Sequence, residues 1–166
     1  MTQARPAGVP APPADELVDG ILSASRALVA VAARSLATVA EDVTLAQYRA
    51  LVELASRGPL RSADLALALT VDRSTATRMC DRLVRKGLVT RRRVDQDRRA
   101  VRISLTPAGQ ELVAEVSRRR RAEIRRIVRR MPASHREWVS EALHSFAAAA
   151  GEVPEQQWSL GWDLER

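Results

Sequence analysis

The chain of 166 residues contains one cysteine, Cys80, and few aromatic residues: three Trp, one Tyr and one Phe. A lone cysteine cannot build an internal disulfide framework, which fits a reducing compartment and predicts a cytoplasmic protein. No apolar run approaches the length of a membrane span, and residues 1–14 lack the apolar core of a signal peptide. The sequence has no catalytic-triad pattern and no glycine-rich phosphate loop, so we expect no enzyme activity.

Metal ligands are scarce as well. The only two histidines, His135 and His144, stand nine residues apart, with no cysteine or carboxylate cluster at ligand spacing. Zinc sites in proteins bring three or four such ligands together, so we predict neither a metal site nor a bound cofactor. Cys80 follows Met79 in a helical pattern, and we expect it to be a buried structural thiol.

Strong helix formers and positive charge dominate what is present. Ala, Leu and Arg are abundant, and 26 of the 27 basic residues are Arg, the exception being Lys86. The net charge is +7 and the isoelectric point is about 11.1. Residues 71–105 hold eleven basic residues against four Asp, and residues 118–130 hold eight Arg against one acid. Positive charge concentrated in this way favours a polyanionic partner.

The first half of the chain has the signals of four helices. Apolar residues at helical spacing predict a helix over residues 15–40. The stretch "TLAQ" is a Thr-x-x-Gln capping box that opens a second helix after Thr44. We expect Ser62 and Asp72 to cap a third and a fourth helix, and Gly87 to end the fourth in a left-handed conformation.

The second half has a hairpin followed by two more helices. Alternating patterns predict short strands in "LVTRRR" (88–93) and "VRISL" (101–105), with a charged tip between them. Pro107 starts a long fifth helix, where its missing N–H has no cost, and Pro132 breaks that helix. A second capping box, "SHRE" at 134–137, is expected to open a sixth helix. Two helices joined by a short turn and followed by a hairpin form a winged helix-turn-helix, whose second helix enters the major groove of DNA.

Residues 71–109, "VDRSTATRMCDRLVRKGLVTRRRVDQDRRAVRISLTPAG", resemble the recognition helix and wing of the MarR family of bacterial transcriptional regulators. The stretch "VTLAQYRALVELA" at 43–55 is typical of the second helix of that family. The resemblance extends over about residues 15–150, and its most specific part is Asp-Arg-Arg at 97–99. It implies an obligate homodimer built from the first, fifth and sixth helices. It also implies a pseudopalindromic operator in double-stranded DNA, and often release by a small phenolic or anionic effector.

The predicted fold is therefore mainly α: a winged helix-turn-helix with a two-stranded wing and a helical dimerisation region formed by the N- and C-terminal helices. We expect a disordered tail at 1–13, an N-terminal dimerisation helix at 14–43, a DNA-binding domain at 44–106, C-terminal dimerisation helices at 107–150 and a C-terminal tail at 151–166. The apolar stripes of the first and fifth helices are expected to cover each other across a twofold axis. On the fifth helix that stripe consists of Leu112, Val116, Ile124, Ile127 and Met131.

The DNA contacts are expected on the fourth helix and the wing. The resemblance implies that Arg99 enters the minor groove and that Asp97 holds it in position. This agrees with the attraction of arginine to narrow A·T-rich grooves, although a solvated hairpin tip is the alternative. The N-terminal residues of a recognition helix reach base edges, and for each polar residue there base contact and phosphate contact are both open. The expected DNA-contacting residues are Ser62, Arg73, Ser74, Thr75, Thr77, Arg78, Arg82, Arg92, Asp97, Arg98 and Arg99. The run at 118–121 winds around more than one helical turn, so we interpret it as solvated surface.

By the same resemblance, a ligand pocket would lie between the dimer base and the DNA-reading lobe, bordered by Tyr48 and Arg49. A core position for Tyr48 on its apolar stripe is the alternative. The predicted function is a sequence-specific DNA-binding transcriptional regulator, a repressor released by a small-molecule effector. Two alternatives remain open: a winged-helix adaptor that docks a protein, and a constitutive regulator without a ligand. The segment with Trp158 and Trp162 has no clear pattern.

Overall fold

The structure is a computed structural model and describes residues 13–94 and 97–158. The helices are α1 (Ala14–Val39), α2 (Leu45–Arg57), α3 (Ser62–Ala68), α4 (Arg73–Arg85), α5 (Pro107–Arg130) and α6 (Ala133–Ala149). The strands are β1 (Leu60–Arg61), β2 (Val89–Val94) and β3 (Asp97–Leu105), and a 3-10 helix, η1, spans Glu155–Gln157. The predicted winged helix-turn-helix order is confirmed, with one additional strand and one additional 3-10 helix.

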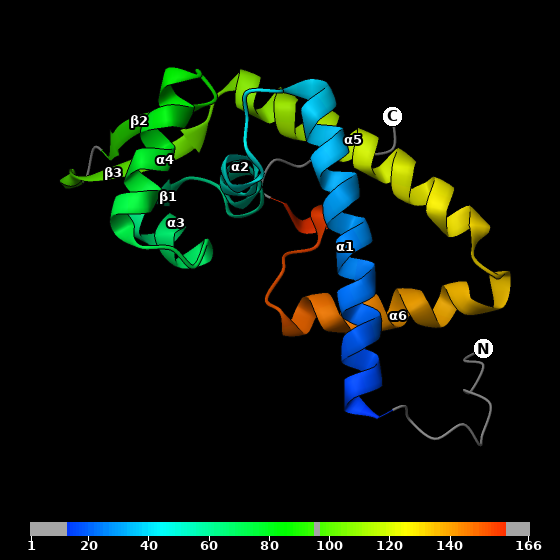
Figure 1. The fold of residues 1–166 in the computed structure, drawn as a ribbon. Helices are drawn as coiled ribbons and strands as arrows, with labels where there is room; N and C mark the ends of the chain where they lie inside the picture. Colours follow the sequence, from blue (N-terminus) through cyan, green and yellow to red (C-terminus); the bar gives the residue numbers. More distant parts are fainter. Residues whose placement is uncertain (1–12, 95–96, 159–166) are drawn as a thin grey trace.

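The molecule has two parts (Figure 1). Helices α2, α3 and α4 and the sheet form one part, which we call the winged lobe. Helices α1, α5 and α6 extend from it as three sides of a triangle, which we call the helical arm. Helix α5 connects the winged lobe with the helical arm, because it begins against β3 and runs outward to α6. The position of the lobe relative to the arm is therefore set where α2 meets α1 and α5.

Helix α2 lies at the centre of the core. Its predicted capping box is confirmed: Thr44 Oγ1 accepts from the Gln47 N–H, and Gln47 Oε1 accepts from the Thr44 N–H, each at 3.2 Å. Every residue from 50 to 55 is buried, and Leu51 is completely inaccessible. This stretch is buried around more than one helical turn because other elements enclose it: α2 contacts α1, α3, α5 and β3.

The helix-turn-helix pair is capped as expected at α4 and differently at α3. The predicted Asp72 cap is confirmed, since its Oδ1 accepts from the Thr75 N–H at 2.8 Å. The predicted Ser62 cap is wrong, because β1 leads directly into the helix and Ser62 is already its first residue. Gly87 ends α4 at a φ of 69°, in the left-handed region as predicted. The turn between α3 and α4 places Thr70 at a φ of 55°.

The sheet has three antiparallel strands in the order β1-β3-β2, where the sequence predicted two. Leu60 pairs with Ile103, and Arg61 pairs with Arg102. On the other edge of β3, Arg92 also pairs with Arg102. Side chains at paired positions lie on the same face of a sheet, so Arg61, Arg102 and Arg92 form a line across all three strands, which we call the arginine row.

Helix α5 begins as predicted and α6 does not. Thr106 Oγ1 accepts from the Gly109 N–H at 3.1 Å and donates to the Gly87 carbonyl at 2.6 Å, with Pro107 as the first helical residue. The predicted capping box at 134–137 is wrong. The chain is already helical at residue 133, after an N-cap proline, so Ser134 lies inside the first turn, where its side chain makes no cap hydrogen bond.

The helical arm exposes large apolar side chains. On α1 and α6 they include Leu17, Val18, Leu22, Leu28, Val29, Trp138, Leu143 and Phe146. On α5, Ile127 and Val128 are exposed, but Leu112 and Val116 are buried in the core of the single chain. The expected uncovered stripe of α5 is therefore wrong for its first half, because α1 and α2 already cover it. Within residues 13–94 and 97–158, no helix combines the length and apolar character required to cross a bilayer.

Candidate nucleic-acid interface

Helix α4 has one buried face and one polar face, as a recognition helix requires. Ala76, Cys80 and Leu83 are buried at intervals of three and four residues, and Met79 is partly buried beside them. Val84 is apolar but 38% exposed, because one residue beyond Leu83 the helix has turned toward solvent. The exposed polar residues of α4 are Arg73, Ser74, Thr77, Arg78, Arg82 and Arg85.

Asp72 organises the first turn of α4. Its Oδ1 accepts from Ser74 Oγ at 2.6 Å and from the Thr75 N–H at 2.8 Å, and its Oδ2 accepts from Thr75 Oγ1 at 2.7 Å. The hydrogen bonds from Ser74 and then Thr75 hold the pKa of Asp72 well below its ordinary value. Because both hydroxyl protons are committed to Asp72, these oxygens can only accept a further hydrogen bond, such as one from a base amino group.

Ser62 joins this surface from the start of α3. Its Oγ lies 3.4 Å from Thr77 Oγ1, and Thr77 Oγ1 lies 2.8 Å from the Arg73 carbonyl, to which it donates. Since Thr77 uses its proton on that carbonyl, Ser62 is the donor in the contact between the two hydroxyls. The structure thus brings Ser62 and Thr77, both expected DNA contacts, side by side.

The arginines of α4 differ in how much they are restrained. Arg78 Nη2 lies 3.2 Å from Thr75 Oγ1 and 3.4 Å from Ser74 Oγ, so its guanidinium is held along the polar face. Arg73 and Arg82 are exposed, and neither makes a hydrogen bond or ion pair with the described residues. Arg82 lines a cleft of about 220 Å³ between α4 and the start of α2. These guanidinium groups are available to an external anion.

Two other basic residues next to α4 already form ion pairs within the chain. Arg91 Nη2 lies 2.7 Å from Asp81 Oδ1. Lys86 Nζ donates to the Asp42 carbonyl at 2.8 Å and forms an ion pair with the Asp42 carboxylate. The hydrogen bond from Lys86 lowers the pKa of Asp42. Lys86 therefore ties the end of α4 to the loop between α1 and α2.

Strands β2 and β3 project from the lobe as a wing (Figure 1). Near its tip, Val94 pairs with Asp97, after a register irregularity between Arg93 and Val94. The side chains of residues 93–100 lie outside the described part of the structure. The expected DNA contacts of Asp97, Arg98 and Arg99 fall in this stretch and stay predictions.

The arginine row is a basic feature that the sequence showed only in part. Arg92 was an expected contact, whereas Arg61 and Arg102 were missed, because their alignment requires the two-residue strand β1. All three are exposed, and none has an ion-pair partner among the described residues. Like charges directly opposite one another destabilise a strand pair, so an anionic partner would stabilise this arrangement. An open cleft of about 590 Å³ adjoins the row; its lining residues are Pro59, Thr90, Arg92, Arg102, Ser104, Leu105, Thr106 and Pro107.

Comparisons with known proteins agree with this geometry. The MarR family profile matches residues 43–101. HTH-type transcriptional repressor MdtR of Bacillus subtilis (strain 168) is 34% identical over 119 residues, which cover 70% of this chain and 75% of MdtR. The crystal structure of RV1404 from Mycobacterium tuberculosis is 40% identical with a TM-score of 0.80, covering 87% of this chain and 99% of that one. The chain belongs to the MarR family. Multiple antibiotic resistance protein MarR of Salmonella typhimurium (strain LT2) is 33% identical over 78 residues, 47% of this chain and 54% of that protein, so the chain spans about half the length of this relative.

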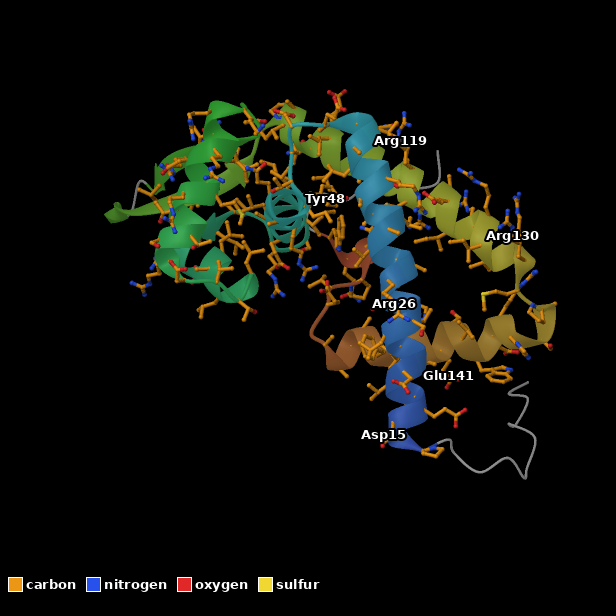
Figure 2. All side chains as sticks on the ribbon, viewed as in Figure 1. Asp15, Arg26, Tyr48, Arg119, Arg130 and Glu141 are labelled. Carbon is orange, nitrogen blue, oxygen red and sulfur yellow. The ribbon has the colours of Figure 1, made fainter. Side chains whose placement is uncertain are left out.

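In this MarR family protein, the two residues expected at a ligand pocket point in different directions. Tyr48 is 4% exposed and lies on the side of α2 that faces the arm (Figure 2). Arg49 lies on the exposed side, with its Nη2 2.6 Å from Glu152 Oε1 and 2.9 Å from Glu53 Oε1. The hydrogen bond to Glu152 raises the pKa of Arg49. Neither Tyr48 nor Arg49 lines the two clefts described above.

Among the described residues, three buried polar atoms lack a hydrogen-bond partner at the junction of α2 and α5: Tyr48 Oη, Ser117 Oγ and Arg120 Nε. Burial raises the pKa of Tyr48, while Ser117 and Arg120 act in the opposite direction, which places both of them next to its hydroxyl. No pattern in the sequence pointed to this cluster. It also corrects our interpretation of residues 118–121 as uniformly solvated, since Arg120 turns its Nε inward.

Cys80 is confirmed as a buried thiol. Burial raises the pKa of Cys80, so little reactive thiolate is present at neutral pH. Within the described ranges, no three His, Cys, Asp or Glu side chains are grouped so that they could hold a metal ion.

Proposed function

We propose that this chain is a sequence-specific, double-stranded DNA-binding transcriptional regulator that acts in the cytoplasm as a homodimer. The observation that carries the proposal is the polar face of α4, with Arg73, Thr77 and Arg78 opposite the buried face. The arginine row adds unpaired positive charge on the adjacent sheet. The similar MdtR is named a transcriptional repressor, and a mutant of MepR from S. aureus that shares the fold at 23% identity was solved bound to an oligodeoxyribonucleotide. We therefore propose repression as its mode of action.

The homodimer is supported by the apolar surface of the arm. Leu143 and Phe146 of α6 and Leu22 of α1 are all about half exposed, beside other apolar side chains of the same helices. Exposed apolar surface that is contiguous marks an interaction site, and most homo-oligomers of soluble proteins are twofold dimers. A twofold axis through the arms would direct two copies of α4 to two half-sites, which predicts a pseudopalindromic operator.

A small phenolic or anionic effector is the second part of the proposal. The hydroxyl groups of Tyr48 and Ser117 and the Nε–H of Arg120 are buried without a hydrogen-bond partner among the described residues, and each is able to donate to a phenolate or carboxylate oxygen. They lie where the lobe meets the arm, so a ligand there would alter the relation between the two. NadR, which shares the fold at 24% identity, was solved in complex with 4-hydroxyphenylacetate. That compound is a suitable first probe.

The test of the main proposal is DNA binding by matched arginine variants. DNA that flanks the gene for this protein is titrated in fluorescence anisotropy against unrelated competitor DNA. Arg73→Ala or Arg78→Ala should lose about 1–3 kcal/mol per half-site if the side chain reads a guanine. Arg126→Ala is the control, because Arg126 carries the same charge and is exposed near the end of α5 opposite the one that begins at Pro107 against β3.

The outcome separates a DNA-binding regulator from the adaptor. Specific binding that falls steeply with salt, and that weakens in Arg73→Ala but not in Arg126→Ala, supports a DNA regulator. Equal losses in both variants would indicate nonspecific attraction alone. If no DNA sequence is preferred over competitor, the winged-helix adaptor becomes the better account. Loss of operator binding on addition of 4-hydroxyphenylacetate would distinguish an effector-controlled regulator from a constitutive one.

A further inference from the structure

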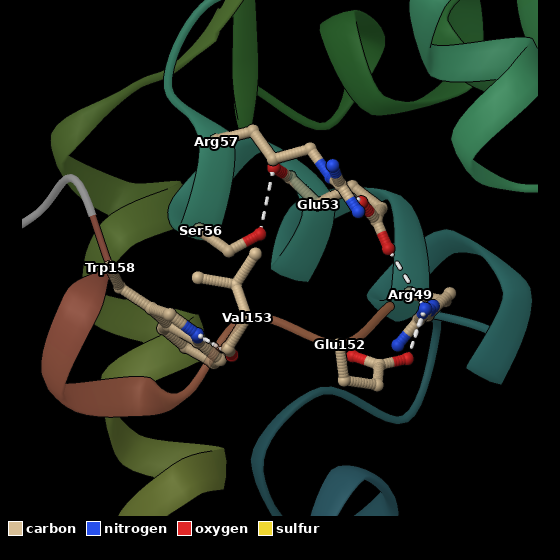
Figure 3. Close-up of polar contacts among 7 residues, drawn as sticks. All are labelled: Arg49, Glu53, Ser56, Arg57, Glu152, Val153 and Trp158. Carbon is tan, nitrogen blue, oxygen red and sulfur yellow. Dashed lines mark hydrogen bonds and ion pairs between the residues drawn. The ribbon is translucent and has the colours of Figure 1, made fainter. Parts of the chain in front are cut away.

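Residues 152–158 return from the end of α6 to the winged lobe and cross the junction of α2 and α5 (Figures 1 and 3). Near the start of this segment, Glu152 Oε1 lies 2.6 Å from Arg49 Nη2 on α2. Further along, Glu155 Oε2 lies 2.8 Å from Arg121 Nη2 on α5. One short segment therefore forms ion pairs with an element of the lobe and with an element of the arm.

The segment is anchored by an aromatic side chain. Trp158 is 8% exposed and belongs to the same buried cluster as residues of α2 and α5, and Val153 packs against that cluster. The Trp158 Nε1–H donates to the Val153 carbonyl at 3.0 Å, which closes the segment around η1. A buried tryptophan with its N–H satisfied contributes a large apolar area without an unmet polar group. The segment is therefore docked onto the lobe, although the sequence grouped it with a C-terminal tail.

On α2, the contact with Glu152 extends a chain of ion pairs (Figure 3). Arg49 also forms an ion pair with Glu53 at 2.9 Å, and Glu53 forms another with Arg57 at 2.8 Å. Glu53 itself is buried, with 3% of its surface exposed. Glu152 thus attaches to an arginine that is already oriented by a buried carboxylate. A pre-oriented guanidinium loses less conformational freedom when it binds a second carboxylate.

We propose that residues 152–158 act as a strap that fixes the winged lobe on the helical arm and so sets the separation of the two lobes in the dimer. Glu152, Glu155 and Trp158 are then positioning residues for DNA recognition, although none lies on the polar face of α4. In a twofold dimer, the lobe-to-lobe distance determines which half-site spacing both recognition helices can occupy together. This inference rests on the proposed dimeric, DNA-binding function.

The first measurement is the lobe-to-lobe distance without DNA. Leu67, which is 79% exposed on α3, is replaced by Cys and spin-labelled, while Cys80 stays unlabelled because it is completely buried. Pulsed electron paramagnetic resonance should give one narrow distance distribution for the otherwise unchanged dimer. Glu152→Gln, Glu155→Gln and Trp158→Ala should each broaden or shift it, because each loosens one attachment of the strap.

Glu115→Gln is the matched control for the two glutamate variants. Glu115 binds Arg118 and Arg119 at 2.6 Å within α5, so its replacement removes similar ion pairs and the same charge without touching the strap. The control should keep the narrow distribution of the parent. The two glutamate variants keep Trp158, so they remain informative if Trp158→Ala does not fold.

The second measurement is binding to operators whose half-sites are moved apart or together by one base pair. The parent should prefer one spacing by about tenfold, which corresponds to about 1.4 kcal/mol. The strap variants should bind the best operator more weakly and discriminate less between spacings. A merely structural role would lower stability without changing this preference.

The outcomes separate the two proposals. A parent protein that dimerises and binds DNA, with strap variants that keep both its distance distribution and its spacing preference, would overturn the strap and leave the proposed function intact. A parent that gives no lobe-to-lobe distance and no specific DNA binding would overturn the proposed function and the strap with it.

Discussion

Gly109→Ala tests how closely α5 begins against the end of α4. A Cβ at position 109 would lie 2.1 Å from the Leu88 carbonyl oxygen and 3.1 Å from its carbon. That carbonyl is held in place, because it accepts from the Thr106 N–H at 3.1 Å. The obstacle is therefore backbone at a hydrogen-bonded junction, and no side-chain rotation can remove it.

The expected magnitude follows from two opposing effects. In an open helix, Ala is more favourable than Gly by about 1 kcal/mol. Here the methyl carbon must move about 1 Å to reach an ordinary carbon–oxygen separation of about 3.3 Å. Forcing additional methyl groups into a packed site costs roughly 1–3 kcal/mol, and more where backbone must shift. Since the obstacle here is backbone, we take a cost of about 2–4 kcal/mol, which exceeds the propensity gain, and expect Gly109→Ala to lower the free energy of unfolding by about 1–3 kcal/mol, or the melting temperature by roughly 2–12 °C in a chain of this size.

The assay is thermal and urea unfolding followed by circular dichroism, with Gly20→Ala as the control. Gly20 lies within α1, and a methyl group there would have nothing within 4 Å, so this substitution should stabilise the protein by about 0.5–1 kcal/mol. If Gly109→Ala melts at or above the temperature of the parent, α5 does not approach Leu88 as the structure indicates. If Gly20→Ala also destabilises the protein, the loss in Gly109→Ala cannot be attributed to the contact with Leu88, because Ala would then be unfavourable even at an open helical position.

Three further predictions concern the interface and the dimer. Hydrogen bonds lower the pKa of Asp72, so the stability from its charged form is complete above the ordinary value of 3.8 and is lost as pH falls below it. Asp72→Ala should thus be less stable than the parent at pH 7, and the difference should shrink in acid unfolding series; a constant difference would contradict this. Arg99→Ala should weaken operator binding by about 1–3 kcal/mol per wing with only partial recovery in Arg99→Lys, and parent-like binding in an anisotropy titration would exclude this wing contact. Phe146→Glu should sediment as a monomer at micromolar concentration, because Phe146 is 51% exposed on α6; an unchanged dimer would place the interface elsewhere.

Features with a local cause were predictable from the sequence. Thr44 and Asp72 cap their helices through contacts three residues away, and Gly87 ends α4 through its own backbone conformation. Such signals depend only on residues that are close in sequence, so they can be recognised without knowledge of the fold. The same holds for the polar face of α4, which follows from helical spacing.

Two capping signals gave wrong predictions, because the helices begin at other residues than the signals indicate. Ser62 and Ser134 are good capping residues by type, but α3 already begins at Ser62, and α6 begins at residue 133, one position before Ser134. At Ser62 the backbone is already directed by pairing of Arg61 with Arg102, which are 41 positions apart in the chain. A tertiary contact thus overrode a residue preference that is worth only about 1 kcal/mol.

Only the tertiary structure decided which charges are free and which groups meet. By composition Arg91 and Lys86 are two more basic residues, but in the structure each forms an ion pair with an aspartate. The arginine row, in contrast, can be recognised only once the register of the three strands is known. The burial of Trp158, the cluster around Tyr48 and the attachment of residues 152–158 all join elements distant in sequence. Periodicity reports which face of an element is apolar, but it carries no information about which other element will cover that face. The sequence by itself therefore determined the helices, their order and the basic recognition face, while the fold determined how the lobe is held on the arm.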